Sequence, residues 1–180
     1  AIIFTILGIV MSAYLIIFTD VDFYHFQEKS FVVKKRVISM NNFINDLEKD
    51  IEREMFIGGY RSIIAINKFM SEDGKFLSDF DKTAEEVFLN GTVNSTVADI
   101  MENASFTEWT DRINEEANNI NINLAFEPIN FYATQEDPWH IIFHLNLSYN
   151  VTDRNNFASW FIFKEYTKEI SLLRFEDPLY

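Results

Sequence analysis

The first 19 residues contain no charged side chain, and the first acid in the chain is Asp20. As a helix, this segment is about 28 Å long, close to the thickness of a bilayer core. A secretory signal peptide needs a basic region and a small-residue cleavage site, and neither is present here. A buried core helix rarely runs this far without a charge. The pattern therefore predicts a membrane span, or a segment that begins in a membrane.

Residues 20–57 contain neither proline nor glycine, so nothing in this stretch is expected to break a helix. Apolar residues recur in its second half at spacings of three and four, which places them on one helical face: Met40, Ile44, Leu47, Ile51 and Met55. We expect one helix over residues 1–57, about 80 Å long, apolar all round at first and amphipathic afterwards. Gly58 and Gly59 then predict a kink, or the start of a separate helix over residues 60–70.

A globular region over residues 58–180 is expected to follow the long helix. Two capping-box sequences predict helix starts in it, Thr83 with Glu86 and Ser105 with Glu108. After the second, apolar residues keep helical spacing as far as Ile120. These signals predict helices over residues 84–90 and 106–119.

From residue 121 the hydrophobic period changes to two, which indicates β-strands. In the stretch 139–151 the odd-numbered positions from Ile141 onwards are apolar, and the even-numbered ones are mostly polar. We expect strands over residues 121–132, 139–151, 158–164 and 166–174. They would form an antiparallel meander of three or four strands with the helices on one face. The predicted fold class is α+β: a long N-terminal helix, a small helical segment and an antiparallel β-sheet domain.

Composition narrows the function classes. The 15 Lys and Arg against 28 Asp and Glu give a net charge of −13, which repels phosphate backbones, so nucleic-acid binding is disfavoured. Apolar residues make up 48% of the chain, which favours a packed domain over disorder. There is no cysteine, and therefore no disulfide framework or thiolate chemistry.

Asparagines that begin an Asn-x-Ser/Thr sequon are concentrated between residues 90 and 152. The chain has 17 Asn and 21 Ser or Thr, from which chance predicts about two such sequons. Two of them fall on the polar positions of a predicted strand. The excess indicates an N-glycosylated extracellular domain, although an Asn-rich chain also acquires sequons by composition alone. The five sequon asparagines are Asn90, Asn94, Asn103, Asn146 and Asn150.

Four basic residues soon after the apolar segment, Lys29, Lys34, Lys35 and Arg36, bear on orientation. The positive-inside rule places these residues, which follow the apolar segment, on the cytoplasmic side of the membrane. A removed leader could supply competing charge, and the rule does not describe a subunit inside a filament. We therefore keep the extracellular assignment for the domain.

We find no constellation that carries catalysis, a cofactor or a metal ion. His140 and His144 lie on a predicted strand, where four residues separate side chains by about 13 Å, so they cannot share an ion. Glu136-Asp137 and Glu176-Asp177 are explained as solvated turns, and no calcium-binding loop is present. Nucleophile-elbow, phosphate-loop and dinucleotide motifs are also absent from the sequence. We expect no enzyme.

A charge-free N-terminal helix, continuing into an amphipathic helix and then a globular domain, resembles type IV pilins and the archaeal pilin and archaellin superfamily. The resemblance covers residues 1 to about 57 and rests on architecture. Bacterial-type pilins carry Glu at the fifth mature position, where this chain has Thr5, and archaeal members often lack that acid. The resemblance implies a leader peptidase that cuts just before the apolar helix. Ala1 would then arise by leader cleavage, and trimming of an initiator methionine is the alternative.

The same resemblance implies a helical filament of identical subunits, inserted in the membrane before assembly and then exposed at the cell surface, where it serves adhesion. Its partners would be the pilus assembly machinery, the leader peptidase and N-linked glycans. The stripe from Met40 to Met55 would form the outer part of the filament core. The core itself would be packed by Ile2, Ile3, Phe4, Ile6, Leu7, Ile9, Val10, Met11, Tyr14, Leu15, Ile16, Ile17 and Phe18.

Two alternatives remain open. A single-span, glycosylated cell-surface protein, such as an adhesin, receptor domain or minor pilin, would have the same helix and sequons. A membrane-tethered enzyme would need a cluster of polar groups that the sequence does not assemble.

Overall fold

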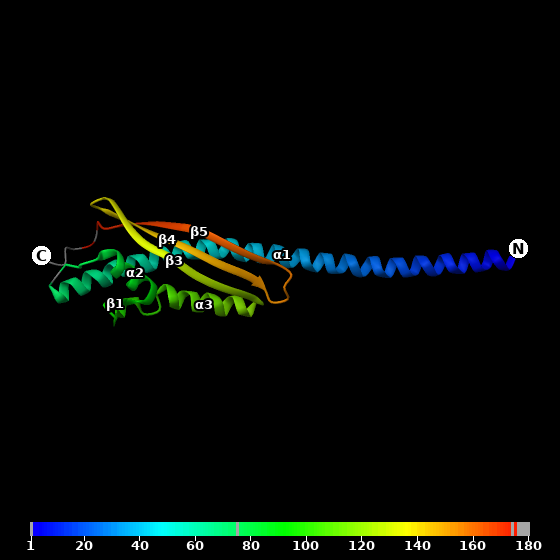
Figure 1. Cartoon of the computed structure of the whole chain (residues 1–180), viewed down its shortest axis with the longest axis horizontal. Helices are drawn as coiled ribbons and strands as arrows, with labels where there is room; N and C mark the ends of the chain where they lie inside the picture. Colours follow the sequence, from blue (N-terminus) through cyan, green and yellow to red (C-terminus); the bar gives the residue numbers. More distant parts are fainter. Residues whose placement is uncertain (1, 75, 174, 176–180) are drawn as a thin grey trace. The chain divides into compact units, whose positions relative to one another are not determined.

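The computed structural model describes residues 2–74, 76–173 and 175, without the side chains of residues 2, 3, 16–29 and 73. The chain divides into two compact units, Ala1–Asn42 and Phe43–Tyr180. The fold is α+β, with antiparallel sheets, as predicted. Its elements in chain order (Figure 1) are α1 (Ile2–Asp73), α2 (Phe80–Asn90), β1 (Thr92–Val93), β2 (Thr96–Val97), the 3₁₀ turn η1 (Asp99–Met101), α3 (Phe106–Asn119), β3 (Ile122–Asp137), β4 (His140–Asp153) and β5 (Ser159–Ser171).

Helix α1 does not break at Gly58 and Gly59, so the predicted end at residue 57 and the separate helix over 60–70 were wrong. The glycines serve close packing instead. A Cβ on Gly59 would lie 2.7 Å from a ring carbon of Phe143 and 2.8 Å from Cδ1 of Ile170. A Cβ on Gly58 would lie 3.0 Å from the Phe88 ring. The missing side chains let α1 lie against α2 and the large sheet, and this contact offsets the low helix propensity of glycine.

One of the two predicted capping boxes is present. Ser105 caps α3, with its hydroxyl accepting from the Glu108 amide and the Glu108 carboxylate accepting from the Ser105 amide. Helix α2 begins earlier than predicted, because Asp79 caps it by accepting from the Lys82 amide. Thr83 instead lies inside the first turn and donates to the carbonyl of Asp79.

The large sheet is an antiparallel meander in the order β3-β4-β5. The predicted strands 158–164 and 166–174 are one strand, since β5 pairs continuously with β4 from Ser159 to Ser171. Strand β3 runs beyond 132 to Asp137, and Pro128 is accommodated at a register shift rather than ending the strand. The odd-numbered residues of β4 are buried throughout, as the period of two predicts.

The small hairpin β1–β2 was not predicted. Asn94 and Ser95 form its two-residue turn with φ of 48° and 64°, the left-handed pair that tight hairpins need. The signal was in the sequence, as an Asn-containing dipeptide between two Thr-Val pairs. The carboxylate of Glu86 holds the hairpin by accepting from the Thr92 hydroxyl and the Ser95 amide.

Stacked aromatic rings form the core between the helices and one face of the sheet. Phe88 of α2 stacks on Phe131 of β3 at 4.4 Å, and Phe131 stacks on Phe143 of β4 at 5.3 Å. Trp109 of α3 packs against Phe126 of β3 at 5.5 Å. Helices α1, α2 and α3 thus contact the same sheet face, and no helix among the described residues covers the other face.

Candidate functional site

The N-terminal part of α1 presents apolar side chains around its whole circumference. We call residues 4–15 the apolar segment. Each of its eight large apolar side chains is more than half exposed: Phe4, Ile6, Leu7, Ile9, Val10, Met11, Tyr14 and Leu15. Contiguous apolar surface of this kind marks an interaction site, because leaving it in water is unfavourable.

The polar group of Ser12 does not interrupt this surface, since its hydroxyl donates to the carbonyl of Ile9 at 2.9 Å. A Cβ built on Gly8 would meet nothing within 4 Å. Gly8 therefore leaves a shallow gap in the apolar segment, where another helix could approach closely.

The rest of the predicted filament core falls outside the part of the chain whose side chains are described, namely Ile2, Ile3, Ile16, Ile17 and Phe18. Within the described part, no helix combines the length and the hydropathy that a membrane crossing requires. The predicted span over residues 1–19 is thus not found among the described residues.

The stripe predicted for the outer filament core is buried within the chain itself. Met40, Ile44, Leu47, Ile51 and Met55 each expose 6% or less of their surface. The helical spacing located the buried face of α1 correctly. Side chains already enclosed cannot also pack against a neighbouring copy, so the proposed outer-core role of this stripe needs correction.

The five sequon asparagines occupy different settings. Asn90, Asn94 and Asn103 are exposed, at the end of α2, in the hairpin turn and in the turn before α3. Asn146 and Asn150 are on β4, half-buried and exposed respectively. All five lie in the Phe43–Tyr180 unit, and four present the side chain to solvent, as attachment of a sugar requires. Their glycosylation stays a prediction.

The two histidines of β4 have separate partners. His140 places Nδ1 2.9 Å from Asp137, and this hydrogen bond raises the pKa of the imidazole. His144 stacks on Tyr132 and contacts Thr134 through Nε2 at 2.9 Å and Glu165 through Nδ1 at 3.2 Å. No group of three or more potential ligands suited to a metal ion occurs in the described part of the chain.

A buried carboxyl group on α1, that of Glu54, was not predicted from the sequence. Glu54 is only 5% exposed, and its Oε1 has no hydrogen-bond partner among the described residues. Burial raises its pKa to about 7, although Arg112 and Arg61 act in the opposite direction. The signal was its position, three residues after Ile51 and seven after Leu47, on the apolar stripe.

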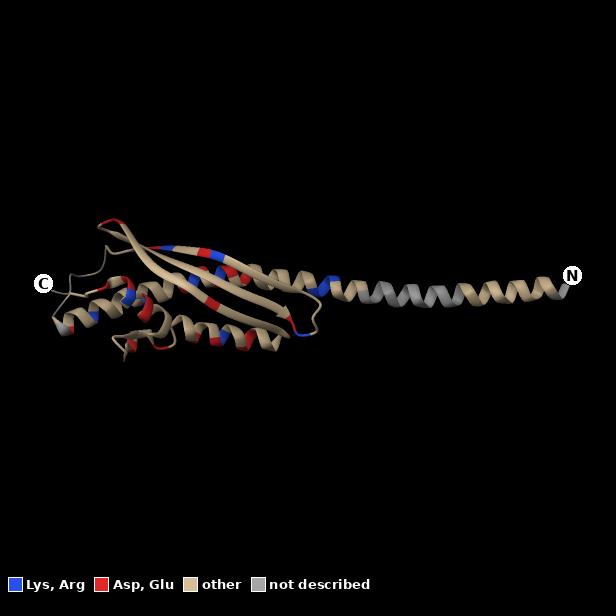
Figure 2. Cartoon of the chain, viewed as in Figure 1, with Lys and Arg blue, Asp and Glu red and all other residues tan. Residues whose placement is uncertain are grey.

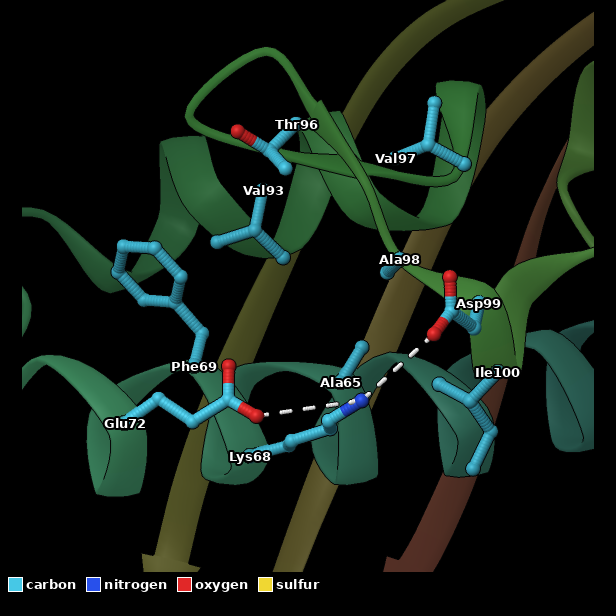
Figure 3. Close-up of a pocket in the computed structure, with 10 residues that line it drawn as sticks. All are labelled: Ala65, Lys68, Phe69, Glu72, Val93, Thr96, Val97, Ala98, Asp99 and Ile100. Carbon is cyan, nitrogen blue, oxygen red and sulfur yellow. Dashed lines mark ion pairs between the residues drawn. The ribbon is translucent and has the colours of Figure 1, made fainter.

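A hollow of about 190 Å³ lies between α1 and the β1–β2 hairpin (Figure 3). The Lys68 ammonium at its rim lies 4.0 Å from the Glu72 carboxylate and 3.8 Å from that of Asp99. Pockets for small ligands usually enclose at least about 300 Å³. This hollow is smaller, and its one lysine is paired with two acids, so it does not suggest a substrate site.

Charge is distributed unevenly along the sequence (Figure 2). Residues 43–180 contain 11 Lys and Arg against 25 Asp and Glu, whereas residues 1–42 contain 4 against 3. The basic residues 34–36 form a blue band on α1 in Figure 2. The Phe43–Tyr180 unit is thus strongly acidic, and two copies of it repel each other at low salt.

Comparisons with protein-family models, curated proteins and solved structures give no match.

Proposed function

We propose that this chain is a structural subunit of an archaeal type IV pilus-like filament, assembled through the apolar segment of α1 and serving adhesion at the cell surface. The observation that carries the proposal is the exposure of all eight large apolar side chains of that segment. The sequon-rich domain supports an extracellular location. The hollow beside the β1–β2 hairpin, with its paired lysine, gives no support to the membrane-tethered enzyme.

The apolar segment supplies enough free energy to hold copies together. Removing one large apolar side chain from water contributes about 1.5–3 kcal/mol, so eight of them contribute about 12–24 kcal/mol per copy. Relative to lipid this gain nearly vanishes. Leaving the membrane for a filament therefore depends on helix packing, on contacts between subunits and on an assembly machinery.

The acidic domain makes the apolar segment more important. Because residues 43–180 carry a net charge of −14, neighbouring domains in a filament repel one another, and the attraction has to come from the helices. Screening by salt weakens this repulsion. We expect filaments to be more stable at high ionic strength than at low ionic strength.

A matched pair of substitutions on α1 tests the proposal. Val10→Asp places a charge in the apolar segment, while Asn41→Asp adds the same charge at an exposed position outside it. Both variants are made in cells that produce the chain, and surface filaments are counted by electron microscopy. We expect Val10→Asp to reduce filaments at least tenfold with the domain still folded, and Asn41→Asp to leave them unchanged. Equal filament numbers for Val10→Asp and the parent chain would refute the proposal.

A further inference from the structure

The face of the large sheet that the helices leave uncovered carries two exposed phenylalanines. We call this face, formed by alternate residues of β3, β4 and β5, the outer sheet face. Phe161 and Phe163 on β5 belong to it and are 74% and 61% exposed. Neighbouring aromatic rings exposed to this degree are unfavourable in water, so something is expected to cover them.

The register of the sheet places a sequon asparagine beside these rings. Asn150 of β4 is directly opposite Phe161, and Phe163 is opposite Ser148, midway between Asn150 and the second sequon residue, Asn146. Directly opposite residues on one sheet face have Cβ atoms about 4.5–5.5 Å apart. A group attached to the Asn150 side chain therefore starts within contact distance of the Phe161 ring.

The Asn150 amide is held by its oxygen. Its Oδ1 accepts from the Thr152 hydroxyl and from the Ser159 hydroxyl, each at 3.3 Å. Thr152 is also the hydroxyl residue of the Asn150 sequon. This arrangement orients the amide while leaving Nδ2, the atom that carries an N-linked sugar, for the modification.

We propose that an N-linked glycan on Asn150 lies over Phe161 and Phe163 and covers the outer sheet face. Sugar rings have one face formed mainly by C–H groups, and this face matches the surface of a phenyl ring. The inference rests on the glycosylation part of the proposed function and does not depend on filament assembly. Its consequence is that the sugar shields the apolar part of this face from contact with other copies.

A double-mutant cycle on the full chain tests this. The chain is produced in a host that glycosylates sequons and is dispersed in mild detergent, and site occupancy is read by mass spectrometry. Thermal unfolding is then compared for the parent chain, Asn150→Gln, Phe161→Ser and the double variant. Phe161 is largely exposed, so Phe161→Ser is expected to fold. Asn94→Gln removes the hairpin sequon, where no aromatic residue is in register, and serves as the control.

We expect Asn150→Gln to lower Tm by about 2–4 °C when Phe161 is present, and to have no effect in the Phe161→Ser background. Asn94→Gln should change Tm by the same amount in both Phe161 backgrounds. Three results overturn the inference: no sugar on Asn150 when Asn94 is occupied, the same Tm change in both Phe161 backgrounds, or a dimer of the glycosylated chain that Phe161→Ser dissociates. The last would mean that a second copy covers the face. If the parent chain formed no filaments while the cycle gave the expected changes in Tm, only the proposed filament function would be contradicted.

Discussion

Glu54→Gln is the substitution whose effect follows most directly from the structure. The buried carboxyl group of Glu54 lies beside Gly58, where an added Cβ would meet its Oε1 at 3.2 Å, and the charges of Arg61 and Arg112 act on it. Its pKa rises from 4.5 to about 7, chiefly because burial disfavours the charged form. Gln has nearly the same shape and does not titrate. The variant therefore isolates the cost of ionising this one group.

The sign follows from proton linkage. Between pH 4.5 and 7 the folded chain holds a proton on Glu54 that the unfolded chain has released, so stability decreases as the pH rises through this window. A shift of this size corresponds to about 3 kcal/mol, which is fully lost above pH 7. Relative to the parent chain, Glu54→Gln should thus gain up to about 3 kcal/mol between pH 4.5 and pH 8.

Urea unfolding of the full chain in mild detergent, followed by tryptophan fluorescence, measures this difference. With a urea dependence of about 1–3 kcal/mol per molar, the midpoint of Glu54→Gln should move by about 1–3 M relative to the parent as the pH is raised. Glu52→Gln, at an exposed position on the same helix, is the control and should follow the parent. If the urea midpoints of the parent chain and Glu54→Gln changed in parallel with pH, Glu54 would not be buried as described.

Two further pairs of substitutions test the packing and the capping. Gly59→Ala should destabilise the domain by about 1–3 kcal/mol, because the new Cβ meets Phe143 and Ile170 at under 3 Å; Gly58→Ala, with its closest contact at 3.0 Å, should cost less, and urea midpoints that rank the two in the opposite order would contradict the packing. Ser105→Ala removes the cap of α3 and should cost about 1 kcal/mol. Ser105→Thr, which keeps a hydroxyl, should restore most of that loss in the same unfolding assay, and equal midpoints for the Ala and Thr variants would contradict the capping role.

Local sequence signals predicted those parts of the fold whose cause is local. The capping box of Ser105 and Glu108, the period of two along β4 and the helical spacing from Met40 to Met55 each depend on residues close in sequence, and the structure confirms the elements that they indicate. The antiparallel meander followed from the short turns between its strands.

The errors arose where distant residues decide the outcome. Gly58 and Gly59 were expected to break the helix, but Phe88, Phe143 and Ile170, far along the chain, require a side chain to be missing there. The split within β5 was wrong because continuous pairing with β4 overrides the local pattern.

The candidate sites divide in the same way. The apolar segment is visible in the sequence as a run without charge. The pairing of Asn150 with Phe161 depends on strand register, which the sequence did not specify, since the length of β5 was misjudged. Glu54 could have been noticed from its position on the stripe, but its burial depends on tertiary packing that the sequence does not show.

The central claim, that this chain builds filaments through the apolar segment, is tested most directly by shearing the surface of cells that produce it. The released material is imaged by electron microscopy and identified by mass spectrometry. The account predicts filaments composed of this chain, with residues 4–15 protected from protease in the intact filament. Recovery of the chain only in the membrane pellet, as a detergent-soluble monomer, would contradict it and favour a single-span surface protein.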